Sequence, residues 1–265
     1  MALWDKIGSS GSIEDRRGSG AALTLGGGIT GLVITAAFLL LSGQSAPQVL
    51  ETILGEAINQ TSTSQQATFE DSTNYKGFAE KVLGSTNEYW GNQFAAQGER
   101  YTPPNFVLFR DITQSGCGIA TSQVGPHYCP SDQTIYLDET FFDEIHRSLG
   151  ANRGDVAQAY VIAHEVGHHV QNLEGSMTQQ TDSVSLELQA DCYAGSWAHS
   201  IASIFENESE VNEALELAGA IGDDRIQQKT EGQINPETWT HGSSEQRIGA
   251  FRQGYATGNS SSCRL

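Results

Sequence analysis

The chain has 265 residues, with 14 Lys and Arg against 32 Asp and Glu, which gives a formal net charge of −18. Proteins bind nucleic-acid phosphates through Lys and Arg, and a chain this acidic is poorly suited to that role. We therefore exclude nucleic-acid binding as a class of function. The length is sufficient for one good-sized hydrophobic core beyond a short N-terminal region.

The N-terminal region combines a polar stretch with an apolar one. Residues 1–20 are rich in Gly and Ser and predict a polar tail, whereas residues 21–42 contain no charged side chain. A run of about 20 apolar or small residues can cross a bilayer as a helix. Cationic residues precede this run (Lys6, Arg16 and Arg17), while residues 44–74 contain neither Lys nor Arg. The asymmetry predicts a single-pass protein of the cell membrane, with residues 1–20 in the cytoplasm and the C-terminal part extracytoplasmic, either periplasmic or at the cell surface.

Two other interpretations of the apolar run remain open. It could be a cleaved signal peptide with a cleavage site near residues 42–46, or a helix buried in the core. Residues 43–68 are rich in Ser, Thr and Gln and predict a linker. We therefore expect the folded domain to occupy residues 69–265.

The folded part divides into a region of short strands and a region of helices. Apolar spacing predicts a helix over residues 75–94, and strands are predicted at 106–109, 116–122 and 134–137. From residue 139 the pattern is helical, with helices expected at 139–148, 154–173, 180–204, 208–228 and 244–255. The order of these elements predicts an α+β domain, a small sheet followed by a helical body.

The four cysteines do not form a CxxC pair, which argues against a zinc site built from cysteines. An exported protein favours disulfides, and we expect Cys117 to pair with Cys129 across a short loop. Cys192 and Cys263 would then tie the C-terminus to a central helix. The alternative is four reduced thiols buried as small apolar side chains.

The strongest chemical signal is His164-Glu165-Val166-Gly167-His168 inside an apolar helical stretch. Four residues of α-helix turn through about 400°, so His164 and His168 project from one face. Two imidazoles so placed can both reach a zinc ion at about 2.0–2.1 Å. Glu165 lies on the adjoining face, where it can reach a water on the metal as a general base. The alternative is a solvated polar stripe, which the apolar neighbours of these residues disfavour.

A catalytic zinc site needs a third protein ligand, and Glu187 meets this requirement. It lies in the stretch 185–191 of the helix expected at 180–204, and Gly175 allows the chain to turn back so that two helices run side by side. Asp191 follows Glu187 by one helical turn and is positioned to accept a hydrogen bond from a ligand histidine. An ordinary exposed helix face is the alternative for both carboxylates.

With these motifs the chain resembles the gluzincin class of metallopeptidases and, more specifically, the bacterial neutral zinc metallopeptidase family. The resemblance rests on HExxH, on Glu-x-x-x-Asp and on stretches that cover most of the chain, namely 14–18, 163–171, 189–195 and 240–247. It implies a zincin-like peptidase fold with Zn²⁺ as the metal. Gly242 stands where membrane-bound gluzincins have proline.

The resemblance also implies a role for His241, since related peptidases use a histidine or tyrosine to donate to the oxyanion of the tetrahedral intermediate. The alternative is a residue at the entry of a helix. Arg247 would pair with Asp191 or Glu187, or be a surface charge. Weaker oxyanion candidates are Tyr128, Tyr136 and Tyr193, and we expect His169 to be structural or at the surface.

These expectations combine into a membrane-anchored zinc endopeptidase that hydrolyses peptide bonds of a protein or peptide substrate, with Glu165 as the base. Two alternatives come from other classes. One is a zinc-stabilised peptide-binding module without catalysis, against which the intact Glu165 argues. The other is a zinc amidase that acts on a non-protein amide, because HExxH does not determine the acyl group.

Overall fold

The computed structural model of the protein describes residues 2–18, 71, 73–178 and 180–264. The predicted transmembrane helix 21–42 and the predicted linker 43–68 lie outside the described residues. Among the helices that are described, none is long and apolar enough to cross a membrane. The described part is a mixed α+β structure, as predicted, with small sheets and a helical body.

The main sheet has the strand order β1-β2-β6-β5. Its strands are β1 (Glu14–Asp15), β2 (Asn105–Leu108), β6 (Thr134–Leu137) and β5 (His127–Cys129). β1 and β6 run parallel to β2, while β5 runs antiparallel to β6, with His127 opposite Tyr136. The strand predicted at residues 134–137 is β6, which is hydrogen-bonded to β2 on one side and to β5 on the other and is buried along its whole length. The two edge strands of this sheet are β1 and β5.

A second, two-stranded sheet consists of β3 (Ile112–Ser115) and β4 (Gly118–Thr121), paired antiparallel. Cys117 lies in the turn between them and forms a disulfide with Cys129 of β5, with a Cα–Cα distance of 5.8 Å. The second disulfide joins Cys192 to Cys263, 71 residues apart. Both predicted pairings are confirmed. They connect the hairpin to the edge of the main sheet and the C-terminal tail to the helical body.

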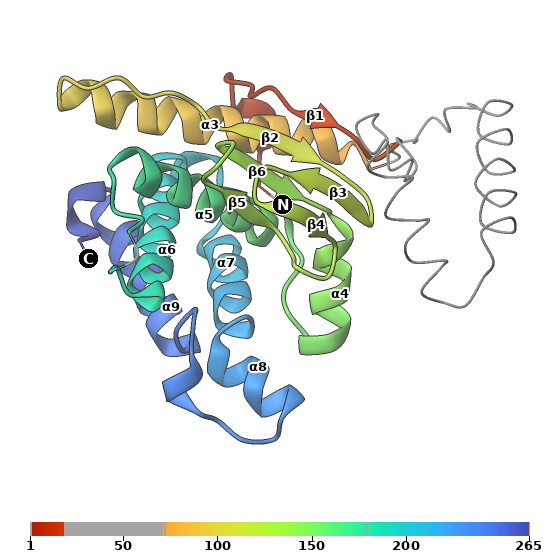
Figure 1. The fold of residues 1–265 in the computed structure, drawn as a ribbon. Helices are drawn as coiled ribbons and strands as arrows, with labels where there is room; N and C mark the ends of the chain where they lie inside the picture. The colour runs from red at the N-terminus through yellow and green to blue at the C-terminus, as the bar shows by residue number, and fades with distance from the viewer. Residues whose placement is uncertain (1, 19–70, 72, 179, 265) are drawn as a thin grey trace, which may run out of the picture. The chain divides into compact units, whose positions relative to one another are not determined.

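The helices follow the predicted order with one break. They are α3 (Tyr75–Ala96), α4 (Thr140–Leu149), α5 (Asp155–Leu173), α6 (Ser183–Ser200), α7 (Glu208–Ala220), α8 (Asp223–Thr230) and α9 (Ser244–Thr257). The helix predicted over 208–228 is two helices, because Gly222 is extended and lies against the backbone of Ser244, where a Cβ would come within 2.4 Å. In Figure 1, α8 lies far from β1 and β2, at the opposite end of the helical body.

Helix α5 is the central element of the core. It contacts α3, α6, α7 and β5 (Figure 1), and most of its residues are buried. Two other close helix contacts depend on glycine. A Cβ on Gly195 would meet the carbonyl oxygen of Phe251 at 2.1 Å, and a Cβ on Gly254 would meet that of Cys192 at 1.9 Å. The absent side chains let α6 and α9 approach with their backbones in contact.

The N-terminal segment 2–16 belongs to the same compact unit as residues 71–265. Ala2, Ile7 and Ile13 are buried in the main core cluster. The backbone N–H of Ala2 and the indole N–H of Trp4 both donate to Asp155, at 3.0 and 2.9 Å. Residues 2–16, which we predicted as part of a polar tail over residues 1–20, therefore pack on the domain in the structure. Although this segment is rich in Gly and Ser, a few of its apolar side chains pack on the domain.

Candidate metal centre

Two histidines of α5 face one carboxylate of α6. The rings of His164 and His168 lie one helical turn apart, with centroids separated by 4.7 Å. Nε2 of His164 is 3.2 Å from Oε2 of Glu187, and Nε2 of His168 is 3.3 Å from Oε1 of the same residue. The three side chains therefore converge through the atoms that bind metals most often in such residues.

A turn and a close helix contact bring Glu187 to this position. The chain reverses after α5 at Gly175, which has a φ of +73°, and α6 begins after Asp182, whose carboxylate accepts from the backbone N–H of Ser185. A Cβ on Gly167 would lie 3.1 Å from the Cα of Ala190, so the glycine in the middle of HExxH allows the helices to approach. Glu187 precedes this contact by about one helical turn and so faces the histidines.

The geometry of this cluster fits a zinc ion. One ligand atom from each of His164, His168 and Glu187 can be chosen so that all lie within 4.8 Å of one another. Within the described ranges, no other group of His, Cys, Asp and Glu meets this criterion. Two imidazole nitrogens and one carboxylate oxygen form a donor set of catalytic zinc sites, where a fourth position is left for water or substrate.

Charged side chains around the cluster shift the pKa values of its three residues. Burial disfavours a charged His164, but the carboxylates of Asp191 and Glu187 outweigh it and raise the pKa of His164 to about 10. Burial likewise opposes the effect of Glu187 on His168, whose pKa is nevertheless raised. Hydrogen bonds from both histidines overcome burial and hold the pKa of Glu187 well below its ordinary value. The carboxylate thus favours positive charge between the rings, and a zinc ion would displace the protons there.

Asp191 supports His164 from the side away from Glu187. It is fully buried and accepts a hydrogen bond from Nδ1 of His164 at 2.8 Å, from Nε of Arg247 at 2.8 Å and from the hydroxyl of Tyr160 at 2.5 Å. Burial raises its pKa, but Arg247 and His164 outweigh this and lower the pKa of Asp191 to about 2. Arg247 is 3% exposed, so it is not a surface charge, and it also donates to the hydroxyl of Tyr160 at 3.1 Å and lies 3.9 Å from the carboxylate of Glu187.

Glu165 lies beside the cluster on the wall of a cavity of about 530 Å³. The three ligand candidates also line this cavity. Apolar side chains of α4 form part of its wall (Phe141, Ile145 and Leu149), and residues 124–128 form another part as the chain enters β5. One cavity is therefore lined by Glu165, by the three candidate metal ligands and by the residues that lead into β5.

His241 lines the same cavity, and a buried carboxylate holds the turn that carries it. Oδ2 of Asp223 accepts the backbone N–H groups of Thr240, His241 and Gly242 at 2.8, 2.6 and 3.0 Å. Oδ1 of Asp223 lies 3.1 Å from Nδ1 of His241. His241 precedes α9, which begins with a separate capping box between Ser243 and Gln246. The imidazole thus has one nitrogen bound to Asp223, and its side chain is 48% exposed.

Comparison with known proteins identifies the family. Residues 2–265 match the family described as "Putative neutral zinc metallopeptidase". The chain belongs to this family. It is 38% identical to the uncharacterized protein YpfJ of Escherichia coli K12 over 281 aligned residues, which cover 98% of this chain and 97% of that protein. The uncharacterized protein Rv2575 of Mycobacterium tuberculosis H37Rv is 44% identical over 182 residues, or 62% of each chain. No solved structure matches the chain.

Other candidate residues have hydrogen-bond partners away from His164, His168 and Glu187. The hydroxyl of Tyr136 donates to Asp132, and that of Tyr193 donates to Glu174. His169 is fully buried between the carbonyl oxygen of Thr102 and the hydroxyl of Tyr128. Tyr128 is the one of the three tyrosine candidates that lines the cavity.

The structure adds three polar residues that we did not predict at the site: Tyr160, Gln171 and Asp223. Tyr160 lies four residues before His164 and Gln171 three residues after His168, so helical spacing alone could have placed both near the ligands. The amide oxygen Oε1 of Gln171 lies 2.8 Å from Nδ1 of His168. Asp223 has no such signal, because the sequence does not reveal that the start of α8 meets the turn at residues 240–242.

Proposed function

We propose that this member of the zinc metallopeptidase family is a zinc-dependent endopeptidase with a zincin-like catalytic domain, in which His164, His168 and Glu187 bind the metal. One observation carries the proposal. The donor atoms of the three ligands converge within 4.8 Å, and Glu165 lines the same cavity. A zinc-stabilised binding module without catalysis would need the ligands but would have no use for this carboxylate.

Zinc bound by these residues supplies a Lewis acid that polarises the substrate carbonyl and lowers the pKa of a water toward about 7. Glu165 accepts the proton of the attacking water and then transfers it to the leaving amine. The ring of His241 is placed to donate to the developing oxyanion, and Asp223 holds the turn that carries it. Arg247 and Asp191 hold His164 in the orientation that directs Nε2 toward Glu187.

An extended peptide is the substrate that the cavity favours. β5 is one of the two edge strands of the main sheet, and residues 124–128, which lead into it, line the cavity. An edge strand has unpaired backbone groups that can hydrogen-bond to a peptide in strand form. In this pose the peptide crosses the cluster next to Glu165, and one side chain enters the apolar wall formed by α4.

We further propose an extracytoplasmic location at a membrane. Two disulfides support it, because such bonds form and persist in oxidising compartments. The charge-free run 21–42 is the feature of the sequence that favours membrane attachment. The side of the membrane on which residues 2–16 lie is a separate question, and the packing of this segment makes it testable.

The decisive test compares two glutamate variants at equal protein concentration. We expect Glu165→Gln to keep about one zinc per chain and to lose peptide hydrolysis, because the amide cannot accept the proton. Glu187→Ala should instead lose zinc affinity, because it removes a ligand. Zinc content is measured by elemental analysis, and hydrolysis with a proteome-derived peptide library. Near-normal turnover in zinc-loaded Glu165→Gln would contradict the proposed mechanism.

A further inference from the structure

The second ligand histidine, His168, has an anchor quite different from that of His164. His164 donates to the buried carboxylate of Asp191. Nδ1 of His168 instead lies 2.8 Å from the amide oxygen Oε1 of Gln171, a side chain with no solvent exposure. No ion pair holds this amide, so its orientation depends on the groups that its own NH₂ contacts.

A chain of hydrogen bonds continues from Gln171 to the C-terminal tail. Nε2 of Gln171 donates to the carbonyl oxygen of Leu186 at 2.7 Å and to Oε1 of Gln189 at 3.0 Å. Nε2 of Gln189 donates in turn to the carbonyl oxygen of Cys263 at 2.8 Å. Gln189 is 8% exposed and Cys263 3% exposed, so water has little access to these bonds. We call the two amides, Gln171 and Gln189, the amide relay.

The backbone carbonyls set the direction of every bond in the amide relay. A carbonyl oxygen can only accept, so Gln189 must turn its NH₂ toward Cys263 and its Oε1 toward Gln171. Gln171 must then turn its NH₂ toward Gln189 and Leu186, which leaves its Oε1 facing His168. That oxygen requires an N–H on Nδ1 of His168. The Nε2 lone pair is then free on the side of Glu187, where a metal binds.

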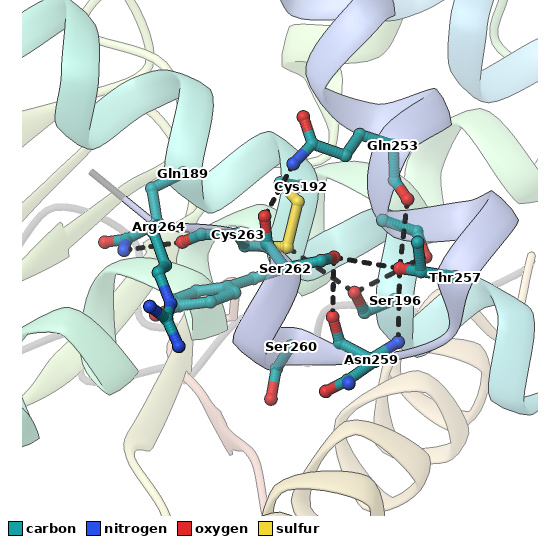
Figure 2. The surroundings of a disulfide bond; sticks show 12 residues. Gln189, Cys192, Ser196, Gln253, Thr257, Asn259, Ser260, Ser262, Cys263 and Arg264 are labelled. Atoms are coloured by element: carbon teal, nitrogen blue, oxygen red, sulfur yellow. Dashed lines mark hydrogen bonds between the residues drawn. A yellow bond between two sulfur atoms is a disulfide. The ribbon is translucent and has the colours of Figure 1, made fainter.

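The last acceptor of the relay is held in place by a disulfide. Cys263 is bonded to Cys192, which lies on α6 three residues after Gln189, as Figure 2 shows. Other contacts of the tail in Figure 2 are hydrogen bonds, such as that from the exposed Gln253 to the carbonyl oxygen of Ser262 and that between the buried hydroxyl of Ser196 and Sγ of Cys263. The covalent bond is the strongest single restraint on the position of Cys263, whose carbonyl oxygen is the last acceptor of the relay.

We propose that the amide relay, with its terminal carbonyl anchored by the Cys192–Cys263 disulfide, positions His168 for metal binding, so that zinc affinity depends on this disulfide. Gln171 and Gln189 are positioning residues and do not touch the substrate. The inference rests on the zinc site of the proposed function, but it concerns metal affinity and is separable from peptide hydrolysis.

The test measures the zinc dissociation constant of the full chain by competition with a chromophoric chelator. Gln171→Met and Gln189→Met keep the length of the side chain and remove its hydrogen bonds. We expect Gln171→Met to weaken zinc binding about 10- to 100-fold, as is typical when a partner of a ligand histidine is lost. Gln189→Met and the double variant Cys192→Ser/Cys263→Ser should each weaken it roughly 10-fold, at the lower end of that range.

The other disulfide provides the matched control. Cys117→Ser/Cys129→Ser removes a bond of the same kind that has no contact with the relay, so its zinc affinity should equal that of the wild type. Combining Gln189→Met with Cys192→Ser/Cys263→Ser should add little to either change alone, because both act on the same hydrogen bond. Melting temperatures of all variants separate a loss of metal affinity from a loss of folded protein.

Each outcome decides the proposal. Wild-type zinc affinity in folded Gln189→Met overturns the relay, even if the double serine variant fails to fold. Weakened binding in Gln189→Met with unchanged binding in Cys192→Ser/Cys263→Ser overturns the role of the disulfide. A wild-type chain that binds zinc tightly but hydrolyses no peptide refutes the proposed function and leaves the relay standing, whereas a chain without zinc affinity refutes both.

Discussion

Nδ1 of His164 lies 2.8 Å from Oδ1 of Asp191, and neither side chain has appreciable solvent exposure. The hydrogen bond fixes the ring of His164 so that Nε2 faces Glu187. Arg247 donates to the same carboxylate and neutralises it within the core. A buried carboxylate without such a cation would carry a large desolvation penalty, so the support of the ligand and the stability of the core depend on one group.

The first prediction follows from this double role of Asp191. Asp191→Asn should weaken zinc binding about 10- to 100-fold, because the amide is a poorer partner for the imidazole. It should also lower the free energy of unfolding by about 3 kcal/mol, because Arg247 is left buried without its counter-charge. Chelator competition and urea denaturation measure the two effects.

Asp182→Asn is the matched control for this substitution. Asp182 caps the same helix from an exposed position. Asn is as good an N-cap as Asp, so zinc affinity and stability should change little. Wild-type zinc affinity in Asp191→Asn would show that the carboxylate is not needed to orient His164.

The second prediction distinguishes three roles for His241. If its imidazole donates to the oxyanion, His241→Ala should lower kcat about 10²- to 10³-fold with little change in KM or zinc content. Asp223→Asn should lower kcat less, because the amide oxygen can still accept some of the backbone hydrogen bonds that hold the turn around His241. A role in helix entry alone predicts a lower melting temperature with unchanged kcat. Loss of zinc in His241→Ala would indicate a ligand role.

The features of the site that depend on helical spacing could be predicted from the sequence, whereas those that depend on tertiary contacts could not. The i, i+4 spacing of His164 and His168 places both on one face wherever the helix lies, and Asp191 follows Glu187 by the same rule. The contact of Gln189 with Cys263 depends on where a tail 74 residues away returns to the core. No local pattern encodes such a return. The break at Gly222 was missed for the same reason, since only its approach to Ser244 requires a glycine-sized residue.

The strands show a similar limit. Residues 134–137 are apolar enough to predict a strand, but their position inside the sheet depends on β5, a strand of three residues next to Pro130 that lacks a clear alternating pattern. The two-residue β1 is polar and exposed and was not predicted at all. Short strands carry little signal of their own, because their stability comes from the neighbours with which they pair.

The third prediction concerns pH and His169. Burial lowers the pKa of His169 below its ordinary value of 6.5, despite the hydrogen bond to the carbonyl oxygen of Thr102. The unfolded chain therefore binds more protons than the folded one as pH falls below about 6.5, and the free energy of unfolding must fall with it. The contribution is complete above about pH 6.5 and is lost progressively toward the folded pKa.

His169→Gln should reduce this slope, because glutamine does not titrate. The measurement is the urea midpoint of metal-free wild type and variant between about pH 5 and 7, taken as a difference so that the other histidines cancel. An equal dependence on pH in both proteins would contradict the prediction. Overall stability should also fall, since His169 joins α5 to Tyr128 in the edge strand.

The last prediction concerns the N-terminal segment, residues 2–16, and the side of the membrane on which it lies. This segment pairs with β2 through β1, and its core contacts include the ring of Trp4 against that of Phe78 at a centroid distance of 5.2 Å. A backbone hydrogen bond also joins this segment to α3, because the N–H of Gly11 donates to the carbonyl oxygen of Glu80 at 2.7 Å. Segments packed in this way must lie on the same side of any membrane, which conflicts with the predicted cytoplasmic position of residues 1–20.

Cysteine labelling in intact cells tests this conflict. All four native cysteines are in disulfides, so a new cysteine is the single free thiol. Ser12→Cys reports on the N-terminal segment and Ser148→Cys on α4, and both positions are exposed. A membrane-impermeant maleimide should label the two variants equally, because both residues belong to one folded unit. Labelling of Ser148→Cys alone would mean that residues 2–16 stay in the cytoplasm and that their packing on the domain does not form in the cell.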